Sequence, residues 1–246
     1  MIPIIFRPFH EVTMYKHPPG WFKPFFWWHQ VGNGSSPQDF KTMWSNTIRG
    51  LNNGGATNLV NAFCINDFFI DGNTNKIYNN ILQLLPDNDL YDIVCFDAYQ
   101  RLNTQTQKNN HPNCNTTQVG DANYNNTNFK NRMIAQVAAI HQLAVDLHKI
   151  PAIGEIGADY FFDNPTWWTS TLQPILNASQ IAYINTWRNP YFKIGDGTSD
   201  KSAYYSAYNN PNANGDVSDR DNRFLGDFIN FYNNNDRVLF LEQIRL

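Results

Sequence analysis

The stretch YDIVCFD, residues 91–97, is a mostly apolar run that ends in a carboxylate. Four other runs share this character: IPIIF (2–6), LVNAFCI (59–65), IPAIGE (150–155) and IAYINTW (181–187). Runs this short and this apolar are typical of strands that are buried on both faces of a parallel sheet. The sequence therefore predicts five such strands.

Helical patterns separate these runs. In SSPQDFKTMW, Ser36 stands at an N-cap position, Pro37 at the first helical position and Asp39 in the first turn. The other expected elements are helices over 75–85 and 130–148, a helix capped by Asn164 with Pro165 first, a helix over 224–232, and a terminal strand at 238–241. Alternating strands and helices indicate βα units around a parallel sheet.

Two architectures are built from such units, the open doubly wound sheet and the (β/α)8 barrel. No glycine-rich phosphate loop follows the first run, which disfavours the nucleotide-binding form of the open sheet. Long loops follow several of the runs, at 12–35, 66–74, 98–124 and 188–220. Barrel enzymes build their sites from loops in these positions. We see no linker or internal repeat, so a single domain is expected.

Bulk composition excludes several functions. The net charge is −3 and the pI about 6.0, which gives no electrostatic case for nucleic acid or an anionic membrane. No apolar run reaches the length of a membrane-spanning helix, and MIPIIF is too short and lacks the basic start of a signal peptide. Aromatic residues make up 15% of the chain, which fits either an aromatic core or a sugar-binding cleft.

The chain has three cysteines, Cys64, Cys95 and Cys114, whose spacing matches no zinc or redox pattern. Cys64 and Cys95 lie in apolar runs and are predicted to be buried thiols, with a disulfide between them as the alternative. His10, His17 and His29 match no metal-ligand pattern either. We therefore expect no metal and a hydrogen-bonding role for His10.

Polar side chains follow four of the predicted strands. They are His10 and Glu11 after the first run, Asp97 and Tyr99 after the third, Glu155 after the fourth, and Trp187 and Arg188 after the fifth. Parallel strands place all these ends on one face of the sheet, and two carboxyl groups are the minimal equipment for glycoside hydrolysis. Each residue alone also has a structural explanation, such as a surface ion pair for Glu11 or a turn or cap for Asp97.

Five ordered motifs carry a resemblance to a known family: RPFHE (7–11), GWFKPFFWW (20–28), DIVCFDAYQ (92–100), GEIG (154–157) and YINTWRN (183–189). They resemble glycoside hydrolase family 26, which consists mainly of endo-β-1,4-mannanases with catalytic glutamates on barrel strands four and seven. The segments at 227–234 and 239–244 look like the family's last helix and tail.

The resemblance implies roles for individual residues. Glu11 would be the acid/base and Glu155 the nucleophile of a retaining double displacement, with Arg7 supporting the acid from below and His10 lining the site. Asp97 and Tyr99 would bind the sugar and hold the nucleophile; Trp187 would stack under a sugar beside Arg188 and Asn189, and Trp21 or Trp27 would take the place of the family's tryptophan after the acid. His29 replaces a usual glycine there.

In the family the acid ends strand four, whereas here it ends the first predicted strand. We therefore expect the last five βα units of a (β/α)8 barrel, with residues 1–246 forming one catalytic domain without its N-terminal strands. The implied protein is a secreted, cofactor-independent mannanase that acts on β-mannan-type polysaccharide and is monomeric at full length. The alternatives are a β-1,3-1,4-glucanase or β-xylanase of the same family, or a non-catalytic carbohydrate-binding or inactive fragment.

Overall fold

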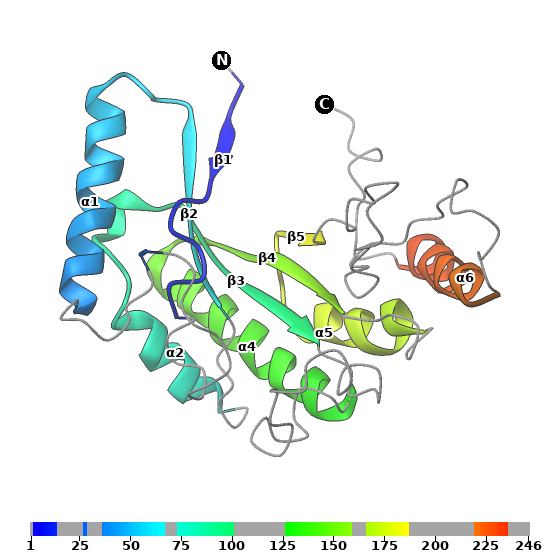
Figure 1. Ribbon diagram of the computed structural model, residues 1–246. Helices are drawn as coiled ribbons and strands as arrows, with labels where there is room; N and C mark the ends of the chain where they lie inside the picture. The colour runs from blue at the N-terminus through cyan, green and yellow to red at the C-terminus, as the bar shows by residue number, and fades with distance from the viewer. Residues whose placement is uncertain are drawn as a thin grey trace. The chain divides into compact units, whose positions relative to one another are not determined.

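The computed structural model describes residues 2–13, 27–28, 36–66, 73–100, 126–158, 166–186 and 219–235. Five strands form one sheet in chain order: β1 (Ile4–Phe6), β2 (Leu59–Asn66), β3 (Ile93–Gln100), β4 (Ile150–Ala158) and β5 (Tyr183–Thr186) (Figure 1). The strands are parallel and connected through helices, which is the arrangement of a partial (β/α) barrel. The five predicted strands and the fold class are confirmed.

The described helices are α1 (Pro37–Asn53), α2 (Thr74–Leu82), η2 (Asn88–Leu90), α4 (Asn126–Leu147), η4 (Trp168–Leu172), α5 (Gln173–Asn177) and α6 (Asp219–Asn234). Helix α2 ends earlier than predicted, because the Leu84 amide bonds to the Ile81 carbonyl at 2.8 Å in a tighter turn. The helix predicted after Pro165 starts as a π-helix, η4, before α5 continues it. The strand predicted at 238–241, like Asn164 and Pro165, lies outside the described residues.

The start of α1 confirms the predicted cap. The Ser36 hydroxyl accepts a hydrogen bond from the Asp39 amide at 3.2 Å, and the Asp39 carboxylate accepts one from the Ser36 amide at 2.6 Å. This reciprocal capping box satisfies amides that would otherwise lack a partner at the helix start. Pro37 occupies the first helical position.

The chain divides into two compact units. The first comprises residues 1–98, 135–155 and 179–185, and the second comprises residues 99–134, 156–178 and 186–246. In the second unit, Asp227 of α6 accepts hydrogen bonds from the amides of Trp168 and Thr169 at 2.8 and 3.2 Å and so caps η4. Arg7, His10, Glu11, Asn66, Asp97 and Glu155 all belong to the first unit.

An aromatic layer packs α1 against β2 in the first unit. The Phe63 ring lies 6.1 Å from Phe40, 5.5 Å from Trp44 and 6.2 Å from Tyr91, measured between centroids. The Trp44 indole donates to the Leu90 carbonyl at 3.2 Å, so its polar atom is satisfied in the core. Part of the high aromatic content is therefore core, as one of the two interpretations predicted.

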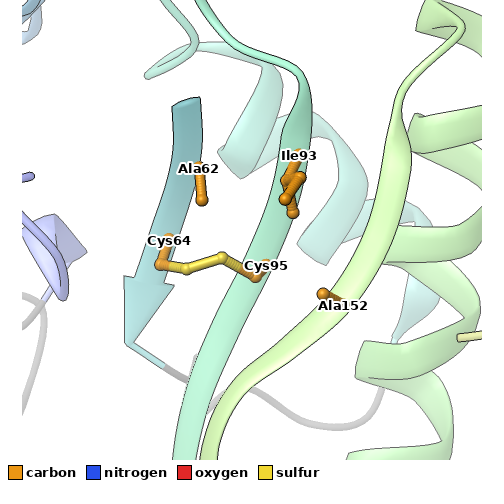
Figure 2. Close-up of a cluster of buried hydrophobic side chains, with 5 residues drawn as sticks. All are labelled: Ala62, Cys64, Ile93, Cys95 and Ala152. Atoms are coloured by element: carbon orange, nitrogen blue, oxygen red, sulfur yellow. A yellow bond between two sulfur atoms is a disulfide. The ribbon is translucent and has the colours of Figure 1, made fainter. Parts of the chain in front are cut away.

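The other face of the sheet carries small residues and sulfur. Ala62 and Cys64 of β2, Ile93 and Cys95 of β3, and Ala152 of β4 form a buried cluster (Figure 2). Cys64 and Cys95 are opposite each other in register, with Cα atoms 4.4 Å apart, and are joined by a disulfide. Both cysteines are buried as predicted, but they form the disulfide that was the alternative to free thiols, because the register that pairs them is a tertiary property.

Burial on both faces is confirmed for β2 and β3 but not for the outer strands. Ile4 and Ile5 of β1 are 51% and 54% exposed, and β5 is also only partly buried. In the described part of the chain β1 has β2 as its strand neighbour and stands first in the sheet. No helix among the described residues has the length and apolar character needed to cross a bilayer.

Candidate active site

A guanidinium links two buried carboxylates near the ends of β1, β3 and β4. Arg7 directly follows β1, and its Nη1 donates to both carboxylate oxygens of Asp97 at 2.6 and 2.7 Å. Its Nη2 donates to Oε1 of Glu155. Asp97 and Glu155 are 0% and 3% exposed, so the cation balances charges that would be costly to bury alone.

Burial and the charges of this cluster shift the pKa values of Asp97 and Arg7. Burial raises the pKa of Asp97 well above its ordinary value, and the nearby charges of Glu155 and Glu11 act in the same direction, whereas Arg7 opposes them. Burial lowers the pKa of Arg7, but the charges and hydrogen bonds of Asp97 and Glu155 outweigh it, so that pKa is raised. Arg7 is therefore a permanent cation of the site.

Glu11 lies in the short loop after β1 and is held by the end of β2. Its amide donates to the Cys64 carbonyl at 3.1 Å, and its Oε1 accepts from Nδ2 of Asn66 at 2.8 Å. Thr13 Oγ1 donates to the Asn66 carbonyl at 2.8 Å. Phe9 and Glu11 have left-handed φ values of 49° and 59°, a conformation that costs roughly 1–3 kcal/mol per residue. The bonds to β2 hold the loop in this shape.

His10 lies between those two left-handed residues, beside two tryptophans. The Trp28 indole donates to the His10 carbonyl at 2.8 Å, and the two rings are 6.0 Å apart. Trp27 packs edge-on against Trp28, with ring centroids 5.7 Å apart, and is 76% exposed. Burial lowers the pKa of His10, the Arg7 charge lowers it further, and Glu155 opposes both. The imidazole is therefore held in its neutral form.

Three side chains offer atoms that a metal ion could bind. Ligand atoms of His10, Asp97 and Glu155 lie within 4.8 Å of one another. Arg7 already donates to both carboxylates, so an ion there would have to displace a cation. The donor set does not favour a metal, and the absence of one remains a prediction from the sequence.

A glycine lies against this cluster. A Cβ atom at Gly154 would lie 2.5 Å from Oδ1 of Asp97, 2.9 Å from Sγ of Cys64 and 3.0 Å from Nη1 of Arg7. Side chains do not approach a Cβ that closely, so the salt-bridged cluster requires glycine at this position of β4.

The structure brings five of the predicted site residues together in the first unit: Arg7, His10, Glu11, Asp97 and Glu155. We expected Arg7 to support Glu11, whereas its guanidinium is bonded to Asp97 and Glu155. Tyr99 is a half-buried residue of β3, and Trp27 is exposed. Trp21, Trp187, Arg188 and Asn189 lie outside the described residues.

Asn66 is the site residue that sequence reasoning missed. It is 7% exposed, ends β2, and faces Asp97 in the register of β2 and β3. The signal was present, because Asn66 directly follows the second apolar run. Like the other candidate site residues, it is a polar residue at the carboxyl end of a predicted strand.

Known proteins resemble this chain in sequence and in fold. The model of glycosyl hydrolase family 26 matches residues 1–162. A family 26 β-mannanase from Bacteroides ovatus is 21% identical with a TM-score of 0.67, over 98% of this chain and 53% of that one. The catalytic domain of an endo-β-1,4-mannanase from Bacillus sp. JAMB-750 is 25% identical with a TM-score of 0.63, over 98% and 52%.

A modular endo-β-1,4-mannanase from Cellulomonas fimi is 21% identical with a TM-score of 0.65, over 100% of this chain and 43% of that one. This chain thus spans about half the length, or less, of the solved structures it resembles. The likeness confirms the barrel-type fold. No curated protein matched the chain.

Proposed function

This chain belongs to glycosyl hydrolase family 26, and we propose that it is a retaining endo-β-1,4-mannanase that cleaves β-mannan and glucomannan. Glu155 is the nucleophile and Glu11 the acid/base of a double displacement that uses no cofactor. The observation that carries this proposal is the difference in surroundings between these two buried glutamates.

The chain contains three glutamates, Glu11, Glu155 and Glu242. Glu11 and Glu155 are 6% and 3% exposed. Glu155 is bonded to the Arg7 cation, whereas Glu11 accepts a hydrogen bond from the neutral amide of Asn66. A carboxylate held by a cation is suited to attack in its charged form, and a carboxyl beside a neutral amide is able to carry a proton. Glycosidases separate the two roles by giving two carboxyl groups different environments.

In the first step, a carboxylate oxygen of Glu155 attacks the anomeric carbon of the sugar. The bond between that carbon and the glycosidic oxygen breaks, and the departing oxygen takes the proton of Glu11. The products are a glycosyl ester of Glu155, an ionised Glu11 and the released part of the polysaccharide. Arg7 keeps the attacking group in place through its bond to Glu155.

In the second step, Glu11 takes a proton from water while the water oxygen attacks the anomeric carbon. The ester bond to Glu155 breaks, which restores both glutamates and releases a sugar with its original anomeric configuration. No redox partner or metal ion takes part in this balance of atoms and electrons.

Further residues are proposed to bind the sugar chain. Trp27 offers an exposed aromatic face beside the Glu11 loop, and sugar C–H groups pack on such faces. Asp97 would act mainly by fixing Arg7, and the neutral His10 would line the site. The remaining proposed sugar-binding residues are Trp21, Tyr99, Trp187, Arg188 and Asn189.

Hydrolysis of four polysaccharides by the 246-residue chain tests the proposal: β-mannan, glucomannan, lichenan and xylan. We expect cleavage of the first two, a β-configured product at early times by proton NMR, and a loss of about a thousandfold in Glu155→Gln and Glu11→Gln. Glu242→Gln, which changes the third glutamate, is the matched control and should retain activity.

Other outcomes would replace the proposal. Preference for lichenan or xylan would make the chain a β-glucanase or β-xylanase, and binding without cleavage would make it a carbohydrate-binding protein. An α-configured first product would exclude a retaining mechanism. The secreted location and the monomeric state of the whole protein are proposals that depend on the family.

A further inference from the structure

Asn66 connects the end of β2 to the loop that carries Glu11. Its side-chain Nδ2 donates to Oε1 of Glu11 at 2.8 Å, and its backbone carbonyl accepts from Thr13 Oγ1 at 2.8 Å. The residue is 7% exposed. We propose that Asn66 is a positioning residue that holds Glu11 by Oε1 and thereby assigns the transferred proton to Oε2.

The loop depends on this connection for its shape. Phe9 and Glu11 both adopt left-handed φ values, so the segment does not relax to this conformation by itself. Two hydrogen bonds join the loop to β2. The Glu11 amide donates to the Cys64 carbonyl, and the Thr13 hydroxyl donates to the Asn66 carbonyl. Asn66 thus fixes the backbone that carries the acid as well as one oxygen of its carboxyl.

The chemistry of the amide determines which oxygen carries the proton. An asparagine Nδ2 only donates hydrogen bonds, so the oxygen that it contacts must present a lone pair. When Glu11 is protonated, Oε1 is therefore the carbonyl oxygen and the proton is on Oε2. After the proton has left, the same bond becomes charge-assisted and stabilises the carboxylate.

Charged and titratable groups also lie near Glu11. Asp97 interacts electrostatically with Glu11, and the other charged or titratable groups of the cluster are Arg7, Glu155 and His10. The hydrogen bond from Asn66 joins one of the two carboxyl oxygens, Oε1, to a donor and so treats the two oxygens differently.

Kinetics provide the first test, which rests on the proposed function. Asn66→Ala should lower kcat/KM on mannan by about 10- to 100-fold, the size of a lost hydrogen bond to a charged group. The alkaline limb of the pH profile should move to higher pH by about one unit, because the carboxylate loses its donor. A 2,4-dinitrophenyl β-mannobioside, whose leaving group needs no proton, should lose less than about threefold in the glycosylation step.

A direct titration provides the second test and needs no activity. With carbon-13 in the glutamate carboxyls, the three glutamates give three signals, which Glu11→Gln, Glu155→Gln and Glu242→Gln assign. In Asn66→Ala the Glu11 signal should titrate at higher pH by about one unit. Asn66→Asp keeps the shape of the side chain, loses the donor and adds a charge, so it should move the signal further.

Asn61→Ala is the matched control. Asn61 lies on the same strand, is also 7% exposed, and its side-chain oxygen has no hydrogen-bond partner among the described residues. Its substitution should leave the Glu11 titration unchanged. If Asn66→Ala fails to fold, Asn66→Leu answers the same question, because it keeps the volume of the side chain and removes the donor without adding a charge.

An unmoved Glu11 titration in a folded Asn66 variant would overturn the positioning role, even if the chain hydrolyses mannan. A chain without hydrolytic activity whose Glu11 signal responds to Asn66 would instead contradict the proposed function. An equal loss on mannan and on the activated glycoside would also overturn the positioning role, because it would mean general damage to the fold.

Discussion

Asn66 and Asp97 face each other in the register of β2 and β3, and each is linked to one of the two buried glutamates, Glu11 and Glu155. Asn66 donates directly to Glu11. Asp97 fixes Arg7, which donates to Glu155. Two paired strand positions thus give the proposed acid a neutral partner and the proposed nucleophile a cationic one.

Loss of the Arg7 cation is predicted to destabilise the fold strongly. Arg7→Met leaves Asp97 and Glu155 buried without it, so the free energy of unfolding in urea should fall by about 3–5 kcal/mol. Arg7→Lys keeps the charge but loses the planar guanidinium that donates to both carboxylates, so its loss of unfolding free energy should be smaller than that of Arg7→Met.

Arg49 of α1 is the control for Arg7. Its side chain is 52% exposed and pairs with Asp87 at 3.3 Å. Because exposed pairs contribute little, Arg49→Met should cost less than about 1 kcal/mol. Equal costs for the two arginine variants would contradict the role given to the buried network.

Gly154→Ala should disturb the salt-bridged cluster, because the new Cβ would lie 2.5 Å from Oδ1 of Asp97. We expect a loss of about 1–3 kcal/mol in unfolding free energy, together with reduced hydrolysis. A Cβ atom at Gly50 would have nothing within 4 Å, and the residue lies inside α1. Gly50→Ala should therefore be neutral or stabilise the protein by up to about 1 kcal/mol. Thermal melts of both variants test the contrast, and a neutral Gly154→Ala would count against it.

The disulfide between Cys64 and Cys95 determines how many free thiols can be titrated before reduction. The chain has three cysteines, so unfolded but unreduced protein should expose one thiol to a colorimetric reagent, and reduced protein three. Closing the loop between Cys64 and Cys95 should stabilise the fold by about 2–4 kcal/mol. Reductant should therefore lower Tm in the wild type but not in the Cys64→Ser, Cys95→Ser double variant. Three thiols before reduction would contradict the pairing.

The lowered pKa of His10 predicts that the stability of the fold depends on pH. Because its pKa in the folded protein lies below the ordinary value of 6.5, the unfolded chain binds the proton more tightly. The contribution of neutral His10 to stability is therefore complete above pH 6.5 and is lost as the pH falls through the lower folded-state value. Urea unfolding at about pH 7.5 and about pH 5.5 should show a smaller loss for His10→Gln than for wild type. Parallel losses would argue against a buried, neutral imidazole.

Local signals in the sequence predicted the elements of the fold. The apolar runs located all five described strands, and Ser36, Pro37 and Asp39 located the start of α1, because capping depends on neighbours in the chain. The convergence of Glu11 and Glu155 followed from the direction shared by parallel strands. These properties need no knowledge of how side chains pack.

Properties that depend on register or on side-chain direction could not be decided from the sequence. The pairing of Cys64 with Cys95 requires the exact alignment of β2 and β3, which no local pattern encodes. The contact of Arg7 with Glu155 rather than with Glu11 depends on a loop with two left-handed residues. Asn66 is a different case, because it is a polar residue at the end of a predicted strand and its place in the sequence was a sufficient signal.

Covalent trapping tests the central claim most directly. A 2-deoxy-2-fluoro mannosyl fluoride donor slows the second step, because the fluorine destabilises the oxocarbenium-like transition state, so the glycosyl ester accumulates. Peptide mass spectrometry of the treated chain should place one sugar on Glu155, and Glu155→Gln should stay unlabelled. A label on another residue, or mannan hydrolysis without any label, would contradict Glu155 as the nucleophile of a retaining mannanase.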